Sequence, residues 1–178
     1  MAKAKTSVFT LKHELSLKDV QTGATIPIGS LIDVGDAQAL EIVSVDFLFA
    51  GVQQTSTSKF YGTVHSACTT NDAGWYVQLM DKNSGDTISP ADNNVIASGM
   101  LLYDAANIVT NDADFYPDDF KGTNGRFVVN DEMYLQARSG FTYAANWTVS
   151  CTVVIQAKVV KLSTRDWMAI SLETVQNE

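Results

Sequence analysis

The sequence predicts an all-β protein, an antiparallel β-sandwich. The first observation is segment 147–162, in which every odd position from Trp147 to Val159 is apolar. Side chains of a strand alternate between its two faces, so this pattern places one apolar row along one side of a long strand. The second observation is that further alternating segments recur with turn-forming residues between them. The third is that no segment shows convincing helical periodicity.

Other strands are expected wherever apolar and polar residues alternate. In segment 39–50, the odd positions from Val43 to Phe49 form one apolar row. Residues 25–32 are expected to form a short edge strand, because Pro27 lacks the N–H that an inner strand donates. Segment 167–174 is expected to add a last strand or a short helix. The remaining expected strands are 7–17, 59–67, 74–81, 95–103, 126–129 and 133–139.

The chain of 178 residues fits one domain, and no linker divides it. We therefore expect a single β-sandwich domain over residues 1–178, with a flexible terminus at 1–6 and a long acidic loop at 104–125. Roughly eight to ten strands are expected, and eight strands in two packed sheets is the strand count of a jelly roll. A single jelly roll is thus the specific prediction.

Charge is sparse and unevenly distributed. Charged residues make up 18% of the chain, against about 25% in a usual soluble domain. Low charge suits an ordinary β domain, and it also suits a surface buried between copies, since interface cores are depleted of charge. The net charge is −8 and there is no basic arm, so direct nucleic-acid binding is not expected. No transmembrane segment and no secretory signal are expected.

The acidic loop is the one candidate ion site. Asp112, Asp114, Asp118 and Asp119 offer the hard oxygen donors that Ca²⁺ prefers, although their spacing is not that of an EF-hand. The alternative is a solvated acidic loop without an ion. No other cofactor is expected.

Aromatic residues in the same loop suggest a contact with another chain. Phe115, Tyr116 and Phe120 have no core face to join by local patterning, and aromatic residues are enriched in interface cores. Thr152 is a further interface candidate, because the polar row of segment 147–162 carries too little charge for an ordinary exposed face. The apolar row of that segment is expected to face the 43–49 row, or a similar one, across the sandwich.

No catalytic arrangement stands out, and the protein is expected not to be an enzyme. His13 and His65 are the only histidines, and His65 with Cys68 supplies too few ligands for zinc. No phosphate-binding glycine motif is present. Cys68 and Cys151 are expected to be free thiols, with Cys151 buried in the apolar row.

The chain resembles the single jelly-roll capsid proteins of tailless icosahedral viruses in its length, its strand count and its two long strands at 39–50 and 147–162. The resemblance implies a structural subunit of a virion, made in the host cytoplasm. Such a subunit would assemble with copies of itself, and with other capsid proteins of the shell, through edges, loops and termini. The alternative is a carbohydrate- or receptor-binding β-sandwich, lectin-like or from a fibre head, with or without calcium.

Overall fold

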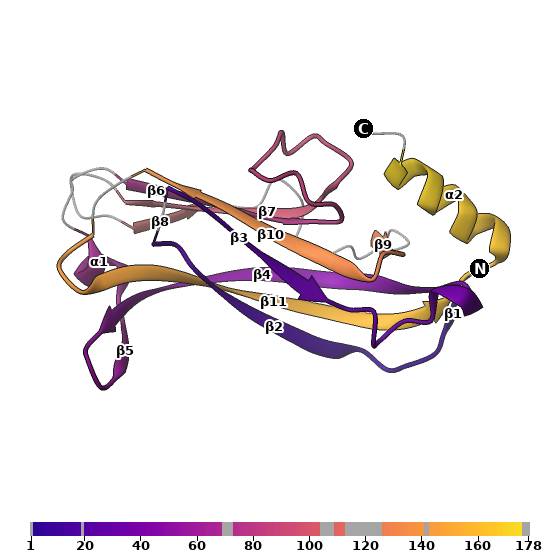
Figure 1. Ribbon diagram of the computed structural model, residues 1–178, viewed down its shortest axis with the longest axis horizontal. Coiled ribbons are helices and arrows are strands. Elements are labelled where there is room, and N and C mark those ends of the chain that lie inside the picture. Colours follow the sequence, from indigo (N-terminus) through magenta and orange to yellow (C-terminus); the bar gives the residue numbers. More distant parts are fainter. Residues whose placement is uncertain are drawn as a thin grey trace.

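A computed structural model describes residues 2–18, 20–68, 73–103, 109–112, 126–140 and 143–175. Within these residues the chain forms two antiparallel sheets packed face to face, with a helix at the C-terminal end (Figure 1). Sheet A contains β1 (Lys3–Ala4), β2 (Phe9–Ser16), β4 (Gln38–Gln54), β5 (Lys59–Gly62), β9 (Arg126–Val128) and β11 (Trp147–Lys161). Sheet B contains β3 (Gln21–Pro27), β6 (Ala73–Met80), β7 (Val95–Tyr103), β8 (Val109–Asp112) and β10 (Glu132–Ser139). The helical elements are η1 (Val34–Asp36), α1 (Val64–Ala67) and α2 (Thr164–Val175).

The strand connections are those of a jelly roll, which confirms the predicted fold. Sheet A has the order β2-β11-β4-β9, and sheet B has the order β3-β10-β6-β7. Numbered along the chain, these eight strands run first, eighth, third and sixth in one sheet, and second, seventh, fourth and fifth in the other. Successive strands thus cross repeatedly between sheets, as in two interleaved Greek keys.

The core confirms the apolar row of the longest strand. Val149, Cys151, Val153, Ile155 and Ala157 of β11 are completely buried. However, β4 is hydrogen-bonded beside β11 in the same sheet and does not lie opposite it, so Val153 pairs with Phe47. The residues that face β11 across the sandwich belong to sheet B and include Trp75, Val77, Leu79, Met133 and Leu135.

Because of a β-bulge, the two faces of β4 differ from the predicted ones. Gln156 pairs with Ser44, whereas the next residue, Ala157, pairs with Ile42. The extra residue in β4, Val43, shifts the alternation by one position. As a result Ile42 is completely buried, while Val43, predicted to belong to the apolar row, is only half-buried.

Several predicted boundaries also change. β4 continues to Gln54, and the strand expected at 59–67 is split between β5 and α1. The edge strand with Pro27 exists, but it spans Gln21–Pro27 and not 25–32. Part of the expected acidic loop forms β8. At the terminus predicted to be flexible, β1 pairs with β11, and the hydroxyl of Thr6 accepts a 2.9 Å hydrogen bond from the N–H of Val159.

The C-terminal segment, expected to be a strand or a helix, forms helix α2. The Ser163 hydroxyl accepts a 3.1 Å hydrogen bond from the N–H of Asp166, which caps the first turn. Trp167 and Ile170 pack against a small second core that contains Val160. None of the helices in the described residues is long and apolar enough to cross a membrane.

Candidate interaction surfaces

The outer face of sheet A holds Thr152, the described member of the predicted interface residues. Thr152 is half-buried and lies in register between Glu14 of β2 and Leu48 of β4. Helix α2 covers one end of this face through Val160, and side chains from β5 cover the other. The strip between them, around Thr152 and Leu48, is the part of the face that the described chain leaves open.

A polar cluster closes the β5 end of this face. Lys59 Nζ lies 2.9 Å from Glu14 Oε1, and the hydroxyl of Tyr61 donates to Glu14 Oε2 at 3.1 Å. Since β5 and β2 flank the β4–β11 pair on opposite sides, these side chains cross over both strands, and Ser150 beneath them is only 2% exposed. The bond from Lys59 lowers the pKa of the Glu14 carboxyl, and the same bond raises the pKa of Lys59. Part of the low-charge polar row is therefore covered by the chain itself.

Large apolar side chains stand exposed beside Thr152 and on the neighbouring hairpin. Leu48 and Tyr61 are each 56% exposed, and Phe60 is 67% exposed. Leu48 lies on the outer face, and Tyr61 points to the same side because its register partner is Val52. Phe60 pairs with Gln53 and points to the other side of β5, which projects away from the sandwich (Figure 1). Grouped exposed apolar residues are typical of protein contact sites. In the sequence, this face of segment 39–50 is mixed, and Leu48 follows Ser44 and Asp46 on it.

The outer face of sheet B is covered differently, by the connection between β6 and β7 at residues 81–94. The Gln78 side chain, completely buried, donates to the carbonyl of Ile88 at 2.9 Å and accepts from the N–H of Ile88 at 2.8 Å. Gln136, 7% exposed, donates to the side chain of Asn83 at 3.1 Å. Buried glutamines thus fasten this loop to the sheet.

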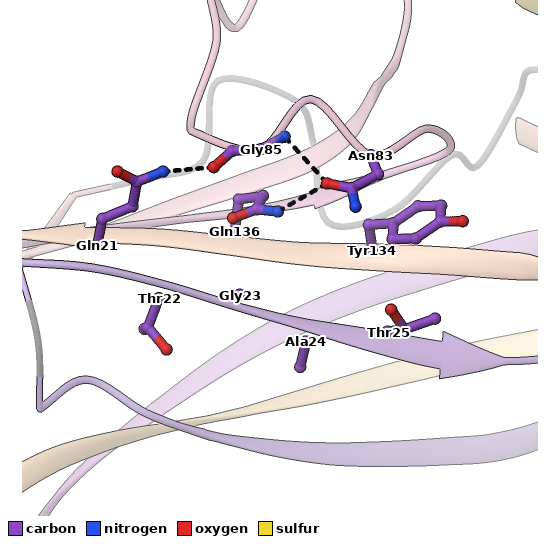
Figure 2. Close-up of a pocket in the computed structure, with 9 residues that line it drawn as sticks. All are labelled: Gln21, Thr22, Gly23, Ala24, Thr25, Asn83, Gly85, Tyr134 and Gln136. Carbon is purple, nitrogen blue, oxygen red and sulfur yellow. Dashed lines mark hydrogen bonds between the residues drawn. The ribbon is translucent and has the colours of Figure 1, made fainter.

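A polar groove of about 500 Å³ runs between β3 and this loop (Figure 2). Its wall is a chain of hydrogen bonds in which Gln21 donates to the carbonyl of Gly85, and both the N–H of Gly85 and the Gln136 amide donate to Asn83. Tyr134, at the end of the groove, donates to Glu132 at 2.6 Å, and this bond raises the pKa of Tyr134 to about 12. Most of the groove's amides therefore already have partners.

The reactive side chains lie apart from both surfaces. Nδ1 of His65 is 3.1 Å from the hydroxyl of Tyr103, and His13 pairs in register with buried Val153. Both cysteines are free, as predicted, and burial raises the pKa of the Cys151 thiol to about 12. No group of three potential metal ligands occurs among the described residues.

The acidic-loop candidates are outside the part of the chain that the structure describes. This applies to Asp114, Asp118, Asp119, Phe115, Tyr116 and Phe120. Asp112 is the last residue of β8, and only its backbone is described. Calcium binding and aromatic anchoring at this loop stay predictions.

Comparisons with known proteins find similarity in structure only. No protein-family model and no curated protein sequence matches the chain. The VP1 protein of Trichodysplasia spinulosa-associated polyomavirus, solved with 3′-sialyllactose, is 11% identical with a TM-score of 0.40, over 91% of this chain and 97% of that one. A structure of Desmodium yellow mottle tymovirus is 10% identical with a TM-score of 0.29, over 89% and 84%. Both neighbours are viral structures, and both TM-scores are below 0.5, so the likeness is weak.

Proposed function

We propose that the protein is a non-enzymatic structural subunit of a viral capsid, which assembles with copies of itself and resides in the virion after synthesis in the host cytoplasm. The observation that carries the proposal is the open strip on sheet A, where Leu48 and Tyr61 are each 56% exposed around Thr152. These side chains offer contact area to another protein, and they offer little chemistry to a small substrate.

The fold agrees with the proposal without deciding it. Jelly rolls serve as capsid subunits, lectins and enzymes, so the function has to be argued from the surface. Low overall charge favours a chain that buries much of its surface against other copies. The alternative, a glycan- or receptor-binding module, would use the polar groove on sheet B. It is less well supported, because Gln136 and Asn83 there already bond to each other.

The test is assembly of the purified protein, followed by light scattering and electron microscopy. We expect large closed assemblies from the native chain. Leu48→Lys and Thr152→Lys each place a charge in the open strip, and both are expected to stay folded while assembling at least tenfold less well, since burying a charge in a contact between copies costs about 1.4 kcal/mol or more. Ala91→Lys adds the same charge to the exposed loop on the opposite side of the molecule and serves as the matched control.

Two outcomes contradict the proposal. One is a native chain that remains monomeric at every concentration. The other is normal assembly by Thr152→Lys and Leu48→Lys, which would mean that this face makes no subunit contact. Calcium binding is tested in the same assay by adding a chelator. Assembly that persists in the chelator would contradict the prediction that assembly depends on calcium at the acidic loop.

A further inference from the structure

Within the described residues, strand β3 lies at the edge of sheet B and pairs on one side only, with β10. The N–H of Ile28 donates to the carbonyl of Asp131 at 2.8 Å, and the N–H of Ser139 donates to the carbonyl of Val20 at 2.8 Å. The even-numbered residues of this segment therefore point their backbone groups toward β10, because these groups alternate in direction along a strand. The N–H and C=O groups of Gln21, Gly23 and Thr25 point the other way, toward the free edge.

This edge lacks the usual protection against pairing with another chain. Proteins commonly block exposed sheet edges with charged residues, especially lysine. Residues 20–28 contain no charged residue, and Pro27 only limits the far end. Every other strand at a sheet edge in the described part contains at least one charged residue. These are Lys3 in β1, Lys12 and Glu14 in β2, Lys59 in β5, Asp112 in β8 and Arg126 in β9.

The free edge is also accessible. Gln21, Gly23 and Thr25 are exposed, and the polar groove is lined by consecutive residues of β3 from Gln21 to Thr25. Figure 2 shows β3 beside β10, and no described strand pairs with the other side of β3.

We propose that β3 pairs antiparallel with β3 of a second copy, about a two-fold axis at Gly23. In this register Gly23 faces Gly23 of the second copy, and Gln21 faces Thr25. All three outward-pointing residues then form hydrogen-bonded pairs, which gives about six backbone hydrogen bonds and joins both copies of sheet B into one continuous sheet. Gly23 places no side chain at the axis.

Two observations favour a second copy over another protein as the occupant. The outward groups are symmetric about Gly23, so the edge is complementary to itself, as a two-fold contact requires. In addition, the chain has a net charge of −8, and two copies repel each other unless they meet through a neutral segment. The uncharged run 20–28 is such a segment, and it lies away from the Leu48 strip on sheet A.

The register is tested by exchanging charges at positions 21 and 25 and measuring dimerisation by sedimentation. In Gln21→Lys/Thr25→Lys, each lysine faces a lysine, and we expect the dimer dissociation constant to rise about tenfold or more. In Gln21→Glu/Thr25→Lys, each lysine faces a glutamate, and we expect dimerisation to return to at least the native level. Both positions are exposed, and thermal unfolding confirms that each variant is folded.

Different results would contradict the pairing of β3, its register or the capsid proposal. A native chain that shows no dimer at millimolar concentration overturns the proposal and leaves an extended segment of another protein as the occupant. Equal dimerisation by both double variants overturns the register. If Leu48→Lys abolishes large assemblies while the double variants do not affect association, the capsid proposal stands and the β3 pairing fails. If the substitutions at positions 21 and 25 change dimerisation but no larger assembly forms, the β3 pairing stands and the capsid proposal fails.

Discussion

Both sheets have an outer face that carries polar side chains, but the chain covers these two faces to different extents. On sheet B, Gln78 and Ser98 are completely buried, because the 81–94 loop lies over them and bonds to Gln78. On sheet A, side chains from β5 and helix α2 cover only the ends, and Leu48 remains 56% exposed. A polar side chain on an outer strand face therefore does not mark a solvated surface, and an apolar one there is the better indicator of a partner.

Both faces depend on the core between them, and a charge placed in that core should have the largest effect. Val153 is completely buried in β11, so Val153→Asp is expected to prevent folding, since an unpaired buried carboxylate costs several kcal/mol. Circular dichroism should show loss of the strand signal. Val154→Asp, at the next, half-buried position on the opposite face, is the control and should still fold. A folded Val153→Asp protein would contradict the assignment of this row to the core.

Opening the closed face of sheet B should have the next largest effect. Gln78→Ala removes both hydrogen bonds to Ile88 and leaves two backbone groups without them, so we expect a loss of about 2–3 kcal/mol in unfolding free energy. Urea unfolding measures the loss, and amide exchange at Ile88 should become faster. Gln156→Ala, at an exposed position of β11, should change stability by less than about 0.5 kcal/mol. Slow exchange at Ile88 in the Gln78 variant would show that the loop does not depend on this glutamine.

The polar cluster on sheet A should contribute least to the free energy of unfolding, and its contribution should depend on pH. The pKa of Glu14 is lowered in the folded chain, so its contribution is complete above the ordinary value of 4.5 and is lost as the pH falls below it. Glu14→Gln should lower stability at pH 7 by a few tenths of a kcal/mol, as exposed ion pairs do. Thermal unfolding of both proteins from pH 7 to pH 3 should show this difference disappearing in acid. A difference that persists at pH 3 would assign the effect to packing and not to charge.

Alternation predicted the strands well and their arrangement poorly. The long strand was expected at 147–162 and is observed at Trp147–Lys161, because its period of two is unbroken on the buried side. The faces of β4 were wrong at Val43, since a bulge depends on the partner strand and leaves no local mark in the sequence. In the sequence, the open strip is marked only by a mixed face on which Leu48 follows Ser44 and Asp46. Its position beside Thr152 required the register of β4 with β11.

The sequence by itself determined the fold class and the burial of Cys151. These follow from local alternation and composition, which every neighbouring residue reinforces. The tertiary structure alone decided that β4 lies beside β11, that Gln78 is buried under a loop, and that β3 is an uncharged free edge. The reason is physical: alternation states which residues of a strand share a face, whereas contacts between distant segments decide what covers that face.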